Sequence, residues 1–181
     1  MEKHSSKPAE SDDEEFSDIS LRPYDISDID DFMVWGTDEN VTKFCSWEPY
    51  RSKEEALDYI NSTVLSHPWF RAICLKNRPI GYMLFTKNDC NKGEVGYGLA
   101  SKYWGKGIVT RALKLMGKII FSDFPELERV EALVDVENVG SQRVLEKAGF
   151  TREGVLRKYY VFKGRSRDWV MFSLLSTDHV Q

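Results

Sequence analysis

Apolar and polar residues alternate along much of the chain, and this pattern predicts a protein built around a sheet. Alternation is typical of a half-buried strand, because successive side chains point to opposite faces. A first strand is expected from Ile19 to Tyr24, and three more follow as a group before residue 101. The full set of expected strands is 19–24, 69–76, 80–87, 93–100, 127–136, 151–162 and 168–175.

Apolar residues at spacings near 3.6 predict four helices between these strands. Ser27 is the expected N-cap of a helix that runs to about Trp35. Ser52 and Glu55 form a capping box for a second helix, which continues to about Ser66. The remaining two helices are expected at about 108–122 and from Asn138 to a stop at Gly149.

The order of these elements predicts one mixed α/β domain. Turn residues at 77–79 and 163–165 join neighbouring strands into hairpins, whereas one strand-helix-strand crossover requires a parallel pair. A chain of 181 residues can bury one substantial core. We expect this domain at 18–176, after a disordered acidic tail at 1–17 and before a short tail at 177–181.

Charge and composition exclude several classes of function. A formal net charge of -4 argues against non-specific binding of nucleic acid. No apolar run approaches the roughly 20 residues that cross a bilayer, so we expect no membrane contact. Three widely spaced cysteines predict neither a disulfide framework nor a zinc site, and we expect no metal. The acidic start has no targeting character, which favours the cytoplasm or the nucleus.

A glycine-bearing turn, Trp104-Gly105-Lys106-Gly107, lies between a predicted strand and a predicted helix. This position suits a phosphate, because the first N–H groups of a helix are unpaired and its dipole is positive there. Lys106 and Thr110 would add donors. Such glycines can also serve only to make the bend. Walker A and dinucleotide fingerprints both fail, the second because Thr110 stands where a third glycine is required.

Two motifs in order resemble the Gcn5-related N-acetyltransferase (GNAT) superfamily. The run from Trp104 to Val109 is similar to the superfamily's Gln/Arg-x-x-Gly-x-Gly/Ala pyrophosphate motif, in the form common to the branch that acetylates ribosomal-protein N-termini. Asn138-Val-Gly-Ser141, followed by 144–150, resembles its Asn-x-x-Ser/Ala and Lys-x-Gly-Phe segment. Gly164-Arg165-x-x-Asp168 also resembles that branch, of which we expect a plant-type member.

The resemblance covers about 19–175 and implies the GNAT acyl-CoA N-acyltransferase fold. That fold is a mixed, mostly antiparallel sheet of six to seven strands with about four helices. It also implies acetyl-CoA as co-substrate, with its pantetheine arm lying between two splayed strands. The implied cofactor contacts are Gly98, Leu99, Trp104, Gly105, Lys106, Gly107, Ile108, Val109, Thr110, Asn138, Ser141 and Lys147.

Acetyl transfer to an amine needs a base, an oxyanion donor and a proton for the leaving thiolate. Glu94 matches a strand glutamate that serves as base in some superfamily members, although it would equally fit an exposed carboxylate or an ion-pair partner. A backbone N–H near Leu99 is the implied oxyanion donor. Ser141 could donate to the thioester sulfur, or it could be a packing residue. Leu145 stands where many members carry a tyrosine suspected of protonating the thiolate.

The acceptor side is less well marked. Arg157, Tyr159 and Tyr160 lie on the strand where the superfamily admits its acceptor, but strands favour aromatic residues in any case. We expect a protein N-terminus or a small amine such as a polyamine as acceptor, and a monomer or homodimer. A CoA-binding regulatory module without turnover is the alternative, and the missing tyrosine at Leu145 is its main support.

Overall fold

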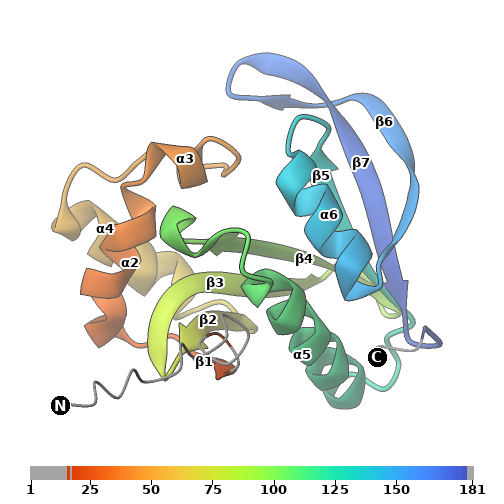
Figure 1. Ribbon diagram of the computed structural model, residues 1–181, viewed down its shortest axis with the longest axis horizontal. Helices are drawn as coiled ribbons and strands as arrows, with labels where there is room; N and C mark the ends of the chain where they lie inside the picture. Colours follow the sequence, from red (N-terminus) through yellow and green to blue (C-terminus); the bar gives the residue numbers. More distant parts are fainter. Residues whose placement is uncertain (1–15, 17, 179–181) are drawn as a thin grey trace, which may run out of the picture.

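The computed structural model describes residue 16 and residues 18–178, and its centre is a single mixed sheet (Figure 1). The strands lie in the order β1-β2-β3-β4-β5-β7-β6. Only β4 and β5 run parallel to each other, which confirms the predicted mixed, mostly antiparallel sheet with one crossover. The strand bounds are β1 Ile19–Pro23, β2 Phe70–Leu75, β3 Arg78–Lys87, β4 Lys92–Leu99, β5 Arg129–Asp135, β6 Thr151–Phe162 and β7 Arg165–Leu175.

Helices cover both faces of this sheet (Figure 1). In the described part of the chain there are five α-helices, one more than the pattern predicts, because α3 is a single turn too short to show a period. Short helical turns flank several of them. The bounds are η1 Ile26–Asp28, α2 Ile29–Gly36, α3 Glu39–Thr42, α4 Lys53–Tyr59, η2 Ile60–Val64, η3 Ser101–Tyr103, α5 Ile108–Asp123 and α6 Val139–Ala148.

The two helical layers bury separate hydrophobic cores. Beneath α5 and α6, Leu113 and Met116 pack with sheet residues such as Phe172. On the other face, Phe32 and Trp35 of α2 pack in a second cluster that belongs to the β1–β4 half. Burial of this much apolar surface is the main stabilising contribution to the fold. No residue of β5, β6 or β7 belongs to this second cluster in the described part of the chain.

Two helix starts differ from the prediction in instructive ways. Asp25, not Ser27, is the first cap, because its carboxylate accepts from Ser27 N while Asp28 reaches back to Asp25 N. Arg22 fixes Asp28 through two hydrogen bonds of 2.8 Å. The expected helix from Ser52 is capped as predicted, but α4 ends at Tyr59 and the chain continues as the π-helix η2.

The hairpin turns are tighter than the sequence suggested. Lys76 and Asn77 have positive φ and form the first turn, so Pro79 lies inside β3, beside an irregularity in its pairing with β2. Lys163 and Gly164 form the last turn, and β7 begins at Arg165 rather than at Asp168. In both places two left-handed residues replace the three-residue turn that was expected.

The predicted tails fall mostly outside the described residues, which exclude 1–15, 17 and 179–181. Phe16, Thr177 and Asp178 are the described residues of these tails, and the Phe16 ring is buried in the core beside α5. No helix in the described part of the chain is long and apolar enough to cross a membrane.

Candidate active site

The glycine turn at 104–107 is an open loop that leads into α5. Gly105 and Gly107 have φ of 77° and 72°, the left-handed region that disfavours side chains. A Cβ at either position would meet no described atom within 4 Å. Gly107 is the N-cap of α5, and no described side chain caps the helix there. The N–H groups of residues 108–110 are therefore left for an anion.

The side chains of this turn are already engaged by the protein. Trp104 donates its indole N–H to the carbonyl of Leu99 at 2.8 Å, which ties the turn to the end of β4. The Lys106 ammonium lies 4.5 Å from the ring centroid of Phe16, and Arg111 donates to the Phe16 carbonyl. Backbone N–H groups, rather than these side chains, are therefore the donors that the turn leaves available for an anion.

Strands β4 and β5 separate after a short paired stretch. Parallel pairing joins 92–94 to 129–131 and ends there. Beyond it, β4 pairs only with β3, and β5 pairs only with β7. The facing edges of 95–99 and 132–135 thus bound a wedge that has no strand partner, with the glycine turn after its wide end. An extended chain bearing amides could hydrogen-bond along such edges.

Glu94 lies at the narrow end of this wedge. Its neighbours in the sheet are Thr86 on β3 and Glu131 on β5. Partial burial raises the pKa of Glu94, and the nearby Glu131 carboxylate raises it further. Glu131 is itself held by Arg129 at 2.7 Å, and Arg129 also binds both oxygens of Glu153. Glu94 is thus the carboxyl here without a cationic partner among the described residues.

The face of the sheet that carries Glu94 also carries Tyr160 of β6. The pKa of the Tyr160 phenol is raised by burial and by Tyr159, and the Glu94 carboxylate adds to this. The Tyr160 hydroxyl therefore lies within electrostatic reach of Glu94. This proximity to Glu94 is consistent with the expectation that Tyr160 lies on the side where the acceptor enters.

Ser141 lies on the opposite face, at the start of α6. The Tyr97 hydroxyl and Ser141 Oγ are 2.6 Å apart, and the backbone N–H of Ser141 donates to the Asn138 side chain at 3.1 Å. Burial raises the pKa of Tyr97 well above its usual range, so the phenol stays protonated. Tyr97 faces away from Glu94, as the alternation predicts, but its contact with Ser141 could not be read from the sequence.

The structure brings some of the predicted contacts together and not others. Asn138 caps α6, near Ser141. Lys147 lies in the last turn of α6, about 13 Å along the helix from Asn138 at 1.5 Å per residue. Gly98 is required by packing, because a Cβ there would lie 2.4 Å from the Tyr82 ring. Leu145 is fully buried in the core and leaves no hydroxyl at its position.

His67 is a polar group in the loop before β2. Its Nδ1 accepts from the backbone N–H of Trp69, so Nε2 carries the proton and donates to Thr86 Oγ1 at 3.2 Å. Burial lowers the pKa of His67, which keeps the ring neutral. Because Thr86 is the partner of Glu94 on β3, this imidazole belongs to the surroundings of the carboxylate. Only the folded loop reveals that proximity.

Known proteins resemble this chain in sequence and in fold. The uncharacterized N-acetyltransferase p20 of Bacillus licheniformis is 33% identical over 169 residues, which cover 89% of this chain and 94% of that protein. RimL, a ribosomal L7/L12 alpha-N-protein acetyltransferase crystallised with coenzyme A, superposes with a TM-score of 0.76 at 21% identity, covering 88% and 94% of the two chains. Spermidine N-acetyltransferase of Vibrio cholerae, solved with CoA and spermine, gives 0.74 at 20%, covering 91% and 99%.

The relatives with a stated source are bacterial, so the expected plant-type assignment gains no support. The two solved structures are only 20% and 21% identical to this chain, so they show a shared fold and nothing more. Residues 18–151 match the family model of the acetyltransferase (GNAT) domain. The chain belongs to the GNAT acetyltransferase family.

Proposed function

We propose that this protein transfers an acetyl group from acetyl-CoA to a primary amine, with a protein N-terminus as the acceptor. The observation that carries the proposal is the wedge between β4 and β5, which has an uncapped helix N-terminus after its wide end and a partly buried carboxyl at its narrow end. The phosphates of the donor would bind residues 105–110, and its amide-bearing arm would bind the free strand edges. The match of residues 18–151 to the acetyltransferase (GNAT) domain supports acetyl transfer as the reaction.

The amine nitrogen forms the new bond to the thioester carbonyl carbon of acetyl-CoA, the C–S bond then breaks, and CoA leaves as a thiolate that is protonated to the thiol. Glu94 accepts the proton that the attacking amine releases, a role favoured by its raised pKa. The Leu99 N–H is the proposed donor to the carbonyl oxygen. Glu94 and Ser141 lie on opposite faces of the sheet, so proton removal and proton supply occur on the two sides of the wedge.

The thiolate receives its proton from Ser141, and Tyr97 in turn supplies Ser141. Their hydroxyls are 2.6 Å apart, so a proton can pass between them without rearrangement. This pair takes the place of the tyrosine that Leu145 replaces. The contact counts against a CoA-binding module without turnover, because it offers a phenol that can supply the proton.

Thiol release in the presence and absence of amines tests the proposal. The wild type, incubated with acetyl-CoA, should release thiol at a rate that rises with the concentration of N-terminal peptides. The Ser141→Ala variant should bind acetyl-CoA but turn over more slowly. Thiol release that is independent of amine would indicate thioester hydrolysis, and tight binding without any release would indicate a regulatory module.

A further inference from the structure

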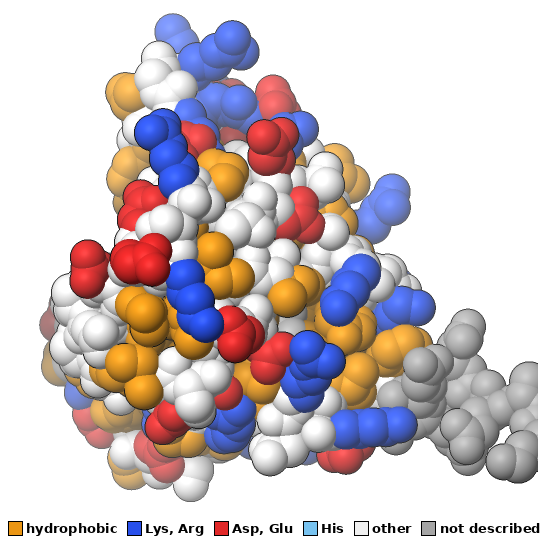
Figure 2. Space-filling model, turned by 90° about the vertical axis from the view of Figure 1, so that its left-hand side faces the viewer, with side chains coloured by type: hydrophobic (Ala, Val, Ile, Leu, Met, Phe, Trp, Pro, Cys, Tyr) orange, Lys and Arg blue, Asp and Glu red, His pale blue; other side chains and the backbone are white. Residues whose placement is uncertain are grey.

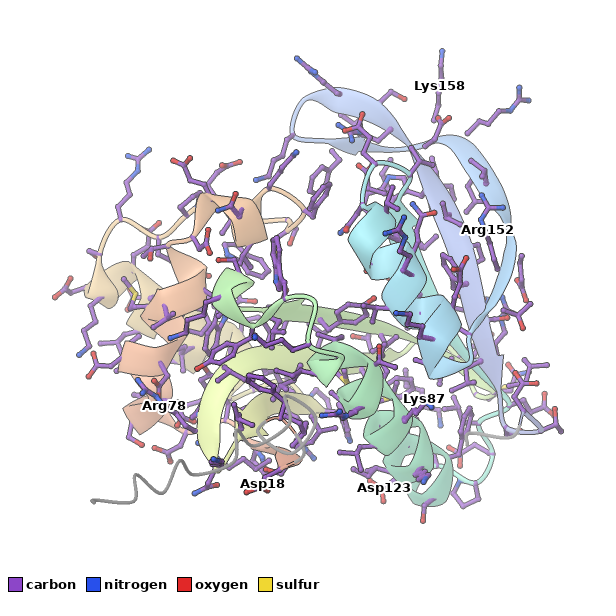
Figure 3. The ribbon with its side chains drawn as sticks, viewed as in Figure 1. Asp18, Arg78, Lys87, Asp123, Arg152 and Lys158 are labelled. Atoms are coloured by element: carbon purple, nitrogen blue, oxygen red, sulfur yellow. The ribbon has the colours of Figure 1, made fainter. Side chains whose placement is uncertain are left out.

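The tip of the β6–β7 hairpin is strongly basic, although the chain as a whole carries a net charge of -4. We call residues 157–168 the basic hairpin. It holds one acidic residue, Asp168, and five basic residues: Arg157, Lys158, Lys163, Arg165 and Arg167. Lys and Arg side chains gather over this end of the molecule in Figure 2, and Lys158 projects outward from it in Figure 3. Nothing in the proposed chemistry requires that charge.

The basic hairpin forms one wall of a cavity of about 340 Å³. The opposite wall is Lys43 and Phe44, at the end of α3. Asp135, the last residue of β5, also lines it. The remaining lining residues are Phe162, Lys163, Arg165 and Arg167. The cavity therefore combines two aromatic rings with four cations.

Two of these cations hold the cavity together. Lys163 donates to the carbonyls of Thr42 and Trp47 and pairs with Glu48, which ties the basic hairpin to the loop after α3. Arg167 lies 2.9 Å from Asp135 and 2.6 Å from Glu137. Both side chains thus have acidic partners.

The other two cations have no such partners. Lys43 and Arg165 are exposed, and neither side chain makes an ion pair or hydrogen bond within the described residues. Asp135, in contrast, is buried and bonded to Arg167, so it does not neutralise them. The cavity presents uncompensated positive charge to any ligand that enters it.

The distance from this cavity to Glu94 fits an extended peptide. Glu131 lies beside Glu94, and Asp135 follows four residues later on the same face of β5. At about 3.3 Å per residue this is roughly 13 Å. An extended acceptor with its amine at Glu94 would therefore bring about its fourth residue to the cavity. The neighbouring rings of Phe44 and Phe162 suit the stem of that side chain.

We infer that the acceptor is a protein N-terminus with an acidic side chain at about its third to fifth residue, which binds Lys43 and Arg165. The inference rests on the proposed function and narrows it. A polyamine acceptor is disfavoured, because its second cation would enter a cavity that is already positive. Exposed charge pairs contribute little to affinity and act mainly on specificity. We therefore expect kcat/KM to be about tenfold higher for an acceptor with an acidic side chain than for one with a basic side chain at this position.

The test uses four amines and three proteins. The amines are spermidine and three C-terminally amidated peptides that differ only in Asp, Asn or Lys at position four. The proteins are the wild type, the Lys43→Glu/Arg165→Glu variant and a matched Lys118→Glu/Arg152→Glu control. The control makes the same charge change on exposed residues of α5 and of β6 far from its tip. Arg152 is labelled beside β6 in Figure 3, well below Lys158 at the tip of the hairpin.

The wild type and the control should acetylate the Asp peptide with a kcat/KM about tenfold above the Lys peptide, and the preference should shrink at high salt. In the Lys43→Glu/Arg165→Glu variant, kcat/KM for the Asp peptide should be equal to or lower than that for the Lys peptide. Equal kcat/KM values for all three peptides, or a higher kcat/KM for spermidine, would overturn the inference and leave the proposed function intact. So would a rise in the Kd of acetyl-CoA in that variant, which would assign the two cations to the donor's phosphates.

Failure of the proposed function would look different, because no amine would then be acetylated. Calorimetry with CoA-loaded protein still decides the inference in that case. Tighter binding of the Asp peptide than of the Lys peptide supports it, and equal binding contradicts it. Binding of a single-stranded RNA oligomer that is lost in the Lys43→Glu/Arg165→Glu variant, with no peptide preference, would also contradict it.

Discussion

The Gly107→Glu variant tests the proposed anion site at the N-terminus of α5. It changes both the backbone strain and the charge at this position, and Gly107→Ala changes the strain alone. Both substitutions place a side chain at φ 72°, which costs about 1–2 kcal/mol of folding stability. Neither creates a clash, because a Cβ at this position meets no described atom within 4 Å. The glutamate also adds a negative charge where the helix dipole is positive, which offsets roughly 0.3–1 kcal/mol of that loss.

The same negative charge should strongly weaken binding of acetyl-CoA. Two unit charges at about 4 Å repel by about 1 kcal/mol in water and about 4 kcal/mol near a protein surface. A value of about 2–3 kcal/mol corresponds to a Kd roughly 30- to 150-fold higher. The alanine variant lacks this repulsion, so its Kd should change much less although its stability falls by a similar amount.

Isothermal calorimetry with acetyl-CoA and thermal unfolding of the same preparations provide the measurement. The expected result is a glutamate variant that folds about as well as the alanine variant but binds far more weakly. Equal Kd values for the wild type and Gly107→Glu would show that the phosphates bind elsewhere. Equal weakening in both variants would show that backbone strain, not charge, is responsible.

Three further predictions follow from the remaining parts of the site. Glu94→Gln should lower turnover by roughly 10²-fold or more with little change in acetyl-CoA affinity, and a loss below about fivefold would make Glu94 structural. The raised pKa of Glu94 means that wild-type turnover falls as pH drops through a value above the usual glutamate range; the pH profile of the variant should lack this acidic limb. Tyr97→Phe should slow turnover about as much as Ser141→Ala, and the double variant should add little; independent effects by stopped-flow assay would separate the two hydroxyls. Deletion of residues 1–15 should leave the Tm and the Kd of acetyl-CoA unchanged, and a large fall in Tm would contradict the predicted tail.

Local patterns in the sequence were sufficient for most elements of the fold. Alternation placed all seven strands, and six of them pack against a core. Strand β6 is the exception, because none of its residues is buried, and its pairing with β7 holds it in the sheet. The cap at Ser52 and the stop at Gly149 were confirmed, because both depend on contacts within one turn. The second half of the predicted capping box was wrong, because the Glu55 carboxylate accepts from the backbone N–H of Arg51 instead of that of Ser52. The wrong predictions of helix starts were also local, and they arose where two side chains could cap the same helix. Asp25 displaced Ser27 as the first cap because Asp28 and Arg22 complete its network.

The positions of the candidate site residues were predictable where a motif or a strand pattern marked them, and their roles stay predictions. The glycine turn and Asn138 could be identified from their residues, and the position of Glu94 followed from strand alternation. The Tyr97–Ser141 contact and the position of His67 could not, because they join segments that are distant in sequence. The same is true of Lys43 and Arg165, which line one cavity from opposite ends of the chain.

Mass spectrometry of a peptide acceptor tests the central claim most directly. The full-length protein, an N-terminal peptide and acetyl-CoA labelled in the acetyl group would be incubated together, with Glu94→Gln as the matched control. We predict that the peptide gains one labelled acetyl group on its α-amine, and that the control gains it at least about 100 times more slowly. A protein that binds acetyl-CoA and yet leaves every peptide and amine unlabelled would contradict the account.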